Sequence, residues 1–374
     1  MLDFLFKPGK IGTVLLENRI IRSATWSSRA SEDGRVTDDL IKFYEHLAKG
    51  GVGLIITGYI AVDPSGAATP RMMCLFDDSY NQGQRRLVKA VHEHGSVKIA
   101  AQIAHTGSQV LKPGVEMIGP SPFRDPLSKK MAREMSLAEI ESVIRSFIEA
   151  GLRAYDIGYD MLQLHCAHGY LLSDFLSPEI NKRTDDFGGN LVNRIRIIKK
   201  IIISLRDELN KDFPIMVKLN THEYLNNGLT FEEGKIIAKE LDALGVDAIE
   251  PSVGRVYLKF SKNKSYPTVK FDSKSEENYF LSHVRELKPL MNNAKMILMG
   301  GVRDPLQADQ FIKQGITNFI SMSRPLICEP DLPKRWKEGN LDPPICNNCN
   351  ACLFNGMKKK VSCVIRNDKK LEKN

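Results

Sequence analysis

Residues 161–194 have the sequence MLQLHCAHGYLLSDFLSPEINKRTDDFGGNLVNR. The stretch begins with a short apolar run that is typical of a buried strand, and it ends, after two glycines, in a helical pattern. His165, His168 and Tyr170 lie within six residues at the predicted end of the strand. Because imidazoles donate hydrogen bonds and a phenol can supply a proton, this cluster suits the polarisation and protonation of a carbonyl-containing substrate.

The same unit of a strand followed by a helix recurs along the chain. Apolar runs predict strands at 19–25, 52–58, 97–104, 161–164, 215–219, 247–251, 295–299 and 318–322. Helical patterns follow at 38–49, 82–94, 137–157, 191–209, 231–244, 277–291, 305–314 and 330–338. Capping-box sequences mark two of the helix starts, Ser136-x-x-Glu139 and Thr230-x-x-Glu233.

Strands that are each followed by a helix imply a parallel sheet covered by helices, and this order predicts an α/β fold closed into a (β/α)8 TIM barrel. An open, doubly wound sheet is the alternative. It is disfavoured because no G-x-G-x-x-G motif follows the first strand, which instead runs into Ser23-Ala24-Thr25-Trp26.

A barrel places its active site at the C-terminal ends of the strands. The polar and glycine residues expected there are Thr25, Gly58, Gln102 with His105, His165 with His168, Lys218 with Asn220, Ser252 with Gly254, Gly300-Gly301 and Ser323-Arg324. The set offers amide, cationic and backbone donors but no cluster of carboxylates for a hard metal ion. It predicts a flat, anionic ligand that accepts hydrogen bonds.

The last two strand ends predict a phosphate site. Gly300-Gly301 and Ser323-Arg324 follow the seventh and eighth strands, where barrels commonly bind phosphate. Glycines let backbone N–H groups approach an anion, and Arg324 can bind it through paired donors. A tight turn at Gly300-Gly301 without a ligand is the alternative.

Composition and charge limit the classes of protein. The chain has 374 residues, of which 42% are hydrophobic and 26% charged, as in a soluble globular protein. Much of the net charge of +8 falls at 358–374, and no nucleic-acid motif accompanies it. No apolar run approaches the roughly 18–20 residues of a membrane span, and the start MLDFLFKPGKIG lacks a secretion signal. We therefore expect a cytoplasmic protein without nucleic-acid or membrane partners. The protein could form a homo-oligomer.

The cysteines divide unevenly along the chain. Cys346, Cys349, Cys352 and Cys363 form the pattern C-x2-C-x2-C-x10-C, whereas the other cysteines are scattered. Clustering of this kind in a cytosolic chain indicates metal or redox chemistry rather than disulfides. Four thiolates could hold a 4Fe–4S cluster or a structural zinc, and a tail without metal stays open. We expect a barrel at 1–340 and a cysteine-containing, basic extension at 341–374, packed on the barrel or trailing from it.

Several motifs resemble a known family. The segments HCAHGYLL, FLSP, NKRTDDFGGN and NRIR resemble the signature of the Old Yellow Enzyme family of FMN-dependent ene-reductases. The likeness continues, in the same order, in AQIAHTGS, MVKLN, GGVRDP and SRPLICEPDLP. The H-x-A-H-G-Y form and the cysteine-bearing tail are most similar to the branch of 2,4-dienoyl-CoA reductase and NADH oxidase-like proteins. The resemblance implies an FMN-binding barrel that uses NAD(P)H to reduce the C=C bond of an α,β-unsaturated carbonyl compound.

The resemblance also implies catalytic roles. His165 and His168 would donate hydrogen bonds to the carbonyl oxygen of the substrate. Tyr170 would protonate the α-carbon after hydride from flavin N5 reaches the β-carbon. A zinc site at the two histidines is the alternative, but no third ligand is apparent. Trp26 and His105 would shape the substrate pocket, although Trp26 could instead serve only packing.

Cofactor contacts follow in the same way. Gln102 and Thr25 would bind the polar edge of the isoalloxazine, although Gln102 alone could be a satisfied barrel residue. Lys218 would lie near flavin N1 and C2=O. Many relatives carry arginine at this position, which can make a bidentate contact. Lysine here would offer the flavin only a point charge. The remaining contacts implied for the flavin and its phosphate are Ser23, Ala24, Gly58, Ser252, Gly254, Gly300, Gly301, Ser323 and Arg324.

A second hypothesis comes from the tail cysteines. In multidomain relatives with an iron–sulfur cluster, the second and third gaps between cysteines are one residue longer, and further flavin- and nucleotide-binding domains follow. This chain ends at Asn374. A cluster here would need a separate donor, so the chain could be an electron-transfer subunit reduced by a partner protein. A non-catalytic barrel that binds a phosphorylated ligand would leave the set of His165, His168 and Tyr170 without a purpose.

Overall fold

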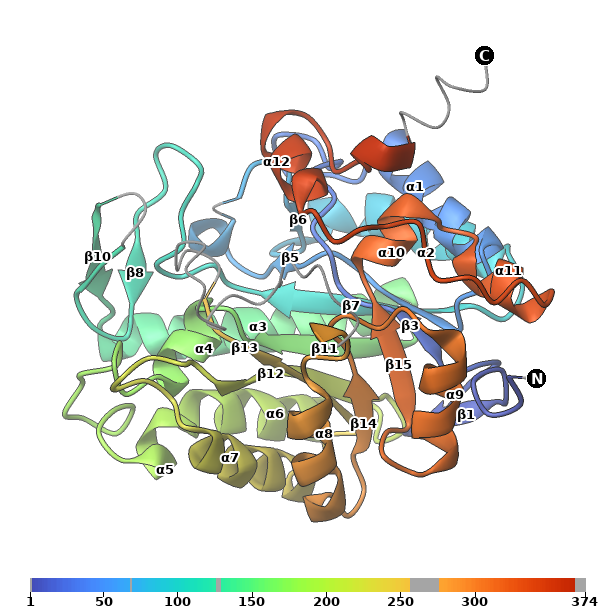
Figure 1. Cartoon of the computed structure of the whole chain (residues 1–374). Coiled ribbons are helices and arrows are strands. Elements are labelled where there is room, and N and C mark those ends of the chain that lie inside the picture. Colours follow the sequence, from blue (N-terminus) through green and yellow to red (C-terminus); the bar gives the residue numbers. More distant parts are fainter. Residues whose placement is uncertain (1, 68, 126–128, 256–275, 367–374) are drawn as a thin grey trace.

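Parallel strands close into an eight-stranded barrel at the centre of the residues that this computed structural model describes, 2–67, 69–125, 129–255 and 276–366 (Figure 1). Strand β11 pairs with both β7 and β12, and the ladder continues from β12 around the sheet to β7. The predicted (β/α)8 fold is therefore confirmed. The barrel strands are β3 (Ile20–Arg22), β4 (Leu54–Ile56), β7 (Lys98–Ala104), β11 (Met161–Cys166), β12 (Ile215–His222), β13 (Ala248–Val253), β14 (Lys295–Leu298) and β15 (Phe319–Met322).

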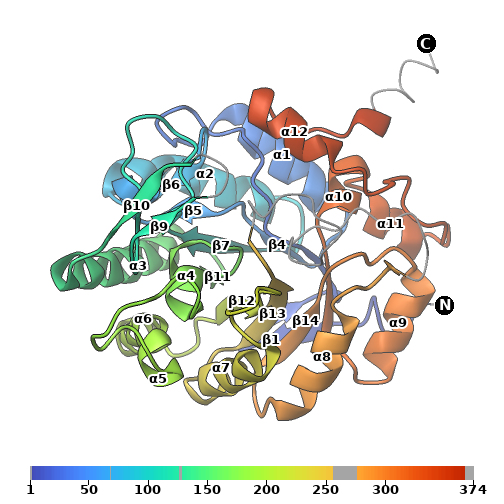
Figure 2. The ribbon, with the colours of Figure 1, turned by 60° about the vertical axis from the view of Figure 1, so that its left-hand side comes forward.

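Helices form a ring around these strands, as Figure 2 shows. They are α1 (Asp38–Lys49), α2 (Asn81–His92), α3 (Leu137–Ile157), α6 (Arg196–Glu208), α7 (Phe231–Ala243), α8 (Leu281–Leu287), α9 (Pro305–Lys313) and α11 (Leu332–Lys337). Both predicted capping boxes are formed at the starts of α3 and α7. In each box the hydroxyl accepts from the backbone of the third helical residue, and the carboxylate there accepts in return.

Two predicted helices differ in extent. The segment 191–209 is split at Ile195 into α5 (Leu191–Arg194) and α6, and the Arg194 guanidinium turns inward to Leu176 O and the Glu233 carboxylate. The segment 277–291 holds the shorter α8, which tightens into a 3-10 turn at Lys288–Leu290. Pro289 in that turn cannot continue an α-helical hydrogen-bond ladder.

Three barrel strands run further than the sequence predicted. β11 continues to Cys166, β12 to His222 and β13 to Val253, beyond the predicted ends at 164, 219 and 251. Polar residues that interrupt the apolar run in sequence stay in the ladder, because His165 is in register with Lys218 and Asn220 with Ser252. These side chains therefore belong to strands rather than to loops.

Side chains at alternate strand positions fill the barrel in two zones. The lower zone, toward the N-terminal strand ends, is apolar and includes the hairpin of β1 (Gly9–Ile11) and β2 (Val14–Leu16). Its members are Ile11, Leu16, Ile21, Leu54, Ile56, Ala100, Met161, Met216, Ala248, Ile297 and Phe319. Two residues further along the strands stand Gln102, Gln163, Lys218, Glu250 and Ser321, all buried. The interior thus changes from apolar to polar toward the C-terminal strand ends.

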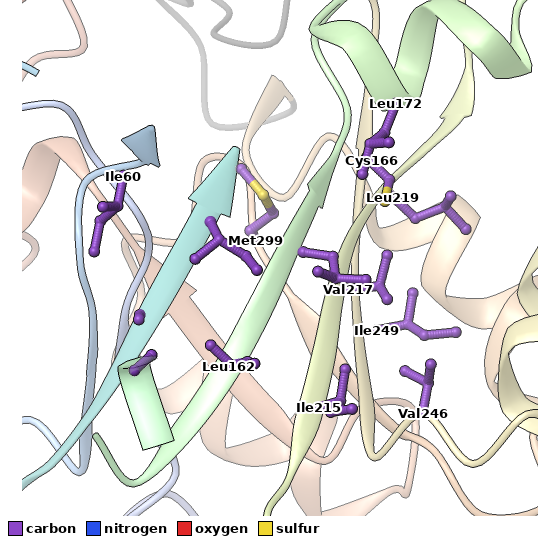
Figure 3. Packing of buried hydrophobic residues seen from close by; sticks show 14 of the residues in the cluster. Ile60, Leu162, Cys166, Leu172, Ile215, Val217, Leu219, Val246, Ile249 and Met299 are labelled. Carbon is purple, nitrogen blue, oxygen red and sulfur yellow. The ribbon is translucent and has the colours of Figure 1, made fainter. Parts of the chain in front are cut away.

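The intervening strand positions pack against the helices in a larger apolar cluster. Figure 3 shows part of it, with Leu162 of β11, Val217 of β12 and Ile249 of β13 on neighbouring strands. Each of these side chains is fully shielded from water. This layer holds the helices on the barrel and fixes the strands whose opposite face carries the polar zone.

Short elements follow the barrel strands on the C-terminal side. They are β5 (Ile60–Ala61), β6 (Met73–Cys74), β8 (Ile118–Gly119), β9 (Phe123–Arg124), β10 (Met131–Glu134), α4 (Leu171–Leu176), α10 (Arg324–Cys328) and α12 (Ala351–Lys358). Among helices in the described ranges, none is both long and apolar enough to cross a bilayer.

The C-terminal segment 341–366 packs onto the barrel, with α12 close to α1 in Figure 2. Arg303 donates to Pro344 O at 2.9 Å and also to Cys346 O. Further along, Val361 N donates to Ser27 O at 3.0 Å. The division of the chain at residue 340 stays a prediction, and 367–374 lie outside the described residues.

Gly234 of α7 gives a test of the packing between helix and barrel. A Cβ atom there would lie 2.2 Å from the backbone oxygen of Thr221 in β12. Alanine is about 1 kcal/mol better than glycine inside a helix, yet we expect Gly234→Ala to lower the free energy of unfolding by about 1–3 kcal/mol because the overlap forces the backbones apart. Urea denaturation measures the change. Lys239→Ala on the exposed face of α7 is the control, with a change within about 0.5 kcal/mol. Stabilisation by Gly234→Ala would contradict this packing.

Candidate active site

A cavity of about 190 Å³ lies at the C-terminal ends of the barrel strands. Its lining residues are Ser23, Ala24, Thr25, Trp26, Tyr59, Thr69, Gln102, Leu111, His165, His168, Tyr170, Lys218, Met299, Ser323, Leu353 and Met357. The structure therefore brings the three predicted catalytic residues into one cavity. Half of the predicted cofactor contacts line the same space: Ser23, Ala24, Thr25, Gln102, Lys218 and Ser323.

The floor of this cavity is a network of buried polar side chains. The Lys218 ammonium donates to Glu250 Oε2 at 3.1 Å and to Ser23 Oγ at 3.0 Å. Ser23 donates in turn to Glu250 Oε1 at 2.7 Å. Gln102 reaches the same carboxylate through Gln163, with amide hydrogen bonds of 2.7 and 3.1 Å. We call Ser23, Gln102 and Lys218 the cavity floor and note that Glu250 connects all three from below.

The catalytic candidates stand at the end of β11. The ring centroid of His165 lies 5.0 Å from that of His168 and 4.8 Å from that of Tyr170. His168 Nε2 lies 2.7 Å from Ser252 Oγ, which fixes one ring nitrogen. His165 Nδ1 is buried without a hydrogen-bond partner in the described residues. Helix α4 begins directly after Tyr170, so the three rings are held between a strand and a helix.

A strained turn orients these rings. His168 has φ of +66° and Gly169 has φ of +73°, both in the left-handed region. Gln109 Nε2 donates to the His168 carbonyl at 2.6 Å. A Cβ atom on Gly169 would lie 2.8 Å from the guanidinium carbon of Arg255, which pairs with the buried Asp174 of α4. The turn is thus clamped from both sides.

Both histidines are held in the neutral form. Burial lowers the pKa of His165 well below its ordinary value, and the Lys218 ammonium lowers it further. Burial also lowers the pKa of His168 far below the ordinary value, with smaller effects from His165 and Lys218. A neutral imidazole carries one N–H donor, so each ring can donate to an oxygen without bringing a net charge into the cavity.

Several lining residues were missed by the sequence analysis. Tyr59 directly follows the predicted strand end at Gly58, and its ring centroid lies 5.3 Å from that of Tyr170. Its hydroxyl oxygen lies 3.2 Å from Thr69 Oγ1, and burial raises the pKa of this phenol. Leu353 and Met357 come from α12 in the extension, far away in sequence. Position after a strand could have identified Tyr59, but no sequence signal identifies the α12 residues.

Other predicted residues do not line this cavity. His105 is buried, with Nε2 3.0 Å from Ser65 Oγ and Nδ1 accepting from Gly107 N. Ser252 contacts His168, and the Gly254 carbonyl accepts from Asn220. Their predicted roles stay predictions.

The predicted phosphate residues lie beside the cavity. Ser323 lines it, and its hydroxyl lies 2.7 Å from Thr25 Oγ1. Arg324 donates to Asn348 O and Asn350 Oδ1 of the extension, at 3.2 and 2.8 Å. Gly300 and Gly301 have φ of +92° and +79°, as the turn predicted there requires. A phosphate at this position stays a prediction.

Gly58, predicted to lie against the flavin, packs against the backbone of the first strand end. A Cβ atom there would lie 2.8 Å from Thr25 O and 3.2 Å from Trp26 Cα. Its N–H donates to Tyr44 Oη at 2.8 Å. Glycine is therefore needed for the close approach that places Thr25 and Trp26 in the cavity wall.

The four tail cysteines face one small cavity. Its lining residues are Arg324, Ile327, Cys346, Cys349, Asn350, Cys352, Cys363, Val364 and Ile365. All four are free thiols. Within the described ranges, no three or more His, Cys, Asp or Glu side chains form a group that could hold a metal ion. Metal binding by these cysteines stays a prediction.

Comparison with known proteins identifies the family. Residues 4–342 match the family model of the NADH:flavin oxidoreductase / NADH oxidase family. The chain belongs to this family. The resemblance to Old Yellow Enzyme predicted from the motifs is thereby confirmed.

Two relatives and one solved structure illustrate the similarity. An NADH oxidase of Thermoanaerobacter brockii is 36% identical over 357 residues, which cover 94% of this chain and 54% of the relative. An NADPH dehydrogenase of Geobacillus sp. (strain WCH70) is 33% identical over 334 residues, 89% of this chain and 93% of the relative. The structure of a 2-naphthoyl-CoA reductase complex is 27% identical with a TM-score of 0.89, covering 98% of this chain and 57% of that one. The chain thus spans about half the length of that NADH oxidase.

The cavity fits the flavin that the family name implies. Its floor offers an ammonium, a hydroxyl and an amide to one side of the space, which matches the carbonyl and ring-nitrogen acceptors of an isoalloxazine edge. Among the described residues, His165 Nδ1 and Trp26 Nε1 are buried without a hydrogen-bond partner, so these two polar atoms of the cavity are available to a ligand.

The lowered pKa values of His165 and His168 predict a loss of stability in acid. In the unfolded chain both imidazoles protonate near about pH 6.5, while the folded protein keeps them neutral, so the unfolded state binds more protons below that pH. We expect the fall in unfolding free energy from pH 7.5 to 5.5 to be about 2 kcal/mol smaller in a His165→Asn/His168→Asn variant than in the wild type. Urea denaturation at both pH values measures this. An unchanged pH dependence would show that folding does not shift the pKa values of these two histidines.

Proposed function

We propose that the protein is an FMN-dependent ene-reductase, which takes hydride from NAD(P)H and reduces the C=C bond of an α,β-unsaturated carbonyl compound. The observation that carries the proposal is the shared cavity. Two neutral imidazoles and a phenol line it together with a floor of Ser23, Gln102 and Lys218. Family membership supports a flavin at this floor.

The chain's own residues would hold the cofactor. Lys218, Gln102 and Ser23 would bind the polar edge of the isoalloxazine, with Thr25 and Ala24 beside it. Ser323 and Arg324, with Gly300 and Gly301, would bind the phosphate at the neighbouring strand ends. FMN held by these residues would supply the hydride chemistry that links the nicotinamide to the substrate.

The histidine pair would bind and polarise the substrate. Neutral His165 and His168 would each donate a hydrogen bond to the carbonyl oxygen, where negative charge develops as hydride arrives at the β-carbon. His168 is pre-oriented for this by Ser252 and by the clamped turn. Preorganised donors in a buried site act without the cost of reorienting during the reaction.

Tyr170 would then deliver the proton that completes the reduction. Its ring lies 4.8 Å from that of His165, so a carbonyl held by the histidines brings its α-carbon near this phenol. A phenol is protonated at neutral pH and can act as a general acid. Apolar Trp26, Leu111, Leu353 and Met357 would contact the rest of the substrate.

A second candidate function is electron transfer through the tail. Cys352 immediately precedes Leu353, which lines the active-site cavity, and Cys352 also lines the cysteine cavity. A 4Fe–4S cluster held by Cys346, Cys349, Cys352 and Cys363 would therefore lie next to the flavin site. It would pass electrons from a separate partner protein. A structural zinc at the same cysteines is the alternative.

Tyr170→Phe tests the proposed proton donor, and Tyr59→Phe serves as its matched comparison because it removes the other phenol of the cavity. We expect Tyr170→Phe to slow flavin re-oxidation by an enone such as 2-cyclohexenone by at least about 100-fold, the range of general acid catalysis. Reduction by NAD(P)H should stay nearly unchanged, and Tyr59→Phe should have the smaller effect. Stopped-flow absorbance separates the two half-reactions. A larger loss with Tyr59→Phe would assign the proton to Tyr59 instead.

Metal analysis of anaerobically purified protein tests the second candidate. A cluster predicts close to four iron and four acid-labile sulfide per chain, and broad visible absorbance that Cys363→Ser removes. Zinc without iron would support the structural site. Protein with neither metal would contradict electron transfer through the tail while leaving the ene-reductase proposal intact. A cytoplasmic location and a homo-oligomer also stay predictions.

A further inference from the structure

Glu250 is a buried carboxylate on which the cavity floor converges, although it does not itself line the cavity. It is 0% exposed and sits in the middle of β13. The sequence analysis did not select it, because its position lies inside a strand rather than past the end of one. Neither the family assignment nor the proposed function gives it a role.

Its two oxygens connect side chains from four other barrel strands or strand ends. Oε1 accepts from Ser23 at 2.7 Å and from Ser321 at 2.5 Å. Oε2 accepts from Lys218 and from Gln163, both at 3.1 Å. Both carboxylate oxygens are therefore fully engaged, as a buried charge requires.

The same contacts fix the floor toward the cavity. Lys218 and Ser23 touch Glu250 directly, and Gln102 is bound to it through Gln163. Lys218 and Glu250 are register partners on neighbouring strands, so their separation is set by the ladder. A flexible lysine stem would otherwise let the ammonium move, since lysine carries a point charge without the planar fork of arginine.

Charge gives the contact a second consequence. Burial alone would raise the pKa of Glu250, but the Lys218 ammonium and hydrogen bonds from Ser321 and Ser23 outweigh burial and hold the pKa below its ordinary value. Glu250 is therefore an anion, and it balances most of the Lys218 charge where the medium screens poorly. A ligand on the cavity floor therefore meets the combined charge of Lys218 and Glu250 rather than the charge of the lysine alone.

We propose that Glu250 is a positioning residue that fixes Lys218, Ser23 and Gln102 on the cavity floor and sets the reduction potential of the flavin bound there. This inference rests on the proposed function for the presence of FMN. A cation beside the isoalloxazine favours the more negatively charged, reduced form. The carboxylate behind Lys218 opposes this effect, so removing its charge raises the potential.

The test measures the midpoint potential of bound FMN by dye equilibration, and its dissociation constant by flavin fluorescence. Glu250→Gln keeps the shape of the side chain and removes the charge. We expect a shift of the potential to more positive values and a dissociation constant about tenfold higher, because the floor donors lose their common anchor. Lys218→Met should shift the potential in the opposite direction.

Asp309→Asn is the matched control. Asp309 is also buried and accepts from the backbone amides of Phe4 and Leu5, at 2.8 and 2.7 Å, away from the cavity lining. Asp309→Asn removes a buried carboxylate just as Glu250→Gln does, so a purely structural effect on the flavin would appear in both variants. The potential should stay unchanged in Asp309→Asn and shift only in Glu250→Gln.

Should Glu250→Gln alone not fold, the double variant Glu250→Gln/Lys218→Met removes the ion pair as a unit, which proteins tolerate better than an unpaired buried charge. Its potential should lie closer to the wild type than that of Lys218→Met. Equal potentials and dissociation constants in wild type, Glu250→Gln and the double variant would overturn the role of Glu250 alone. Wild-type protein that binds no FMN would overturn the proposed function as well, so the two failures are distinguishable.

Discussion

The buried ion pair of Lys218 and Glu250 is the interaction on which the site depends. It sits inside a parallel barrel, two residues above the apolar lower zone, where both side chains are almost completely buried. Such a pair is stable only when its remaining donors and acceptors are satisfied. Ser23, Ser321 and Gln163 meet that need, and in doing so they fix the geometry of the cavity floor. The same hydrogen bonds therefore stabilise the barrel interior and determine the shape of the site.

The opposite side of the cavity is built on a different constraint. His165 belongs to β11, whereas His168 and Tyr170 follow a left-handed turn that leads into α4. The buried pair of Asp174 and Arg255, with Ser108 donating to Asp174 at 2.8 Å, holds that turn in place. A rigid floor and a clamped turn thus face one another across the cavity, which suits a planar cofactor on one side and a substrate on the other.

Much of this arrangement could be predicted from the sequence. Strand and helix periodicity and capping boxes predicted the barrel, and position at or near the C-terminal strand ends indicated the histidine pair, Tyr170, Gln102 and Lys218. The ends of β11, β12 and β13 were predicted too early because polar residues in a barrel interior look like the start of a loop. Glu250 was missed because it lies within the predicted strand 247–251. Leu353 and Met357 reach the cavity only through packing of the extension, which no local pattern encodes.

The central claim is that the floor of Ser23, Gln102 and Lys218 is a flavin site. Spectroscopy of the purified protein, with identification of any flavin released on denaturation, tests this most directly. The account predicts one FMN per chain, or stoichiometric uptake of added FMN by cofactor-free protein, and loss of binding when Lys218→Glu places a second carboxylate on the floor. Colourless protein that takes up no FMN, or a Lys218→Glu variant that binds FMN as the wild type does, would contradict it.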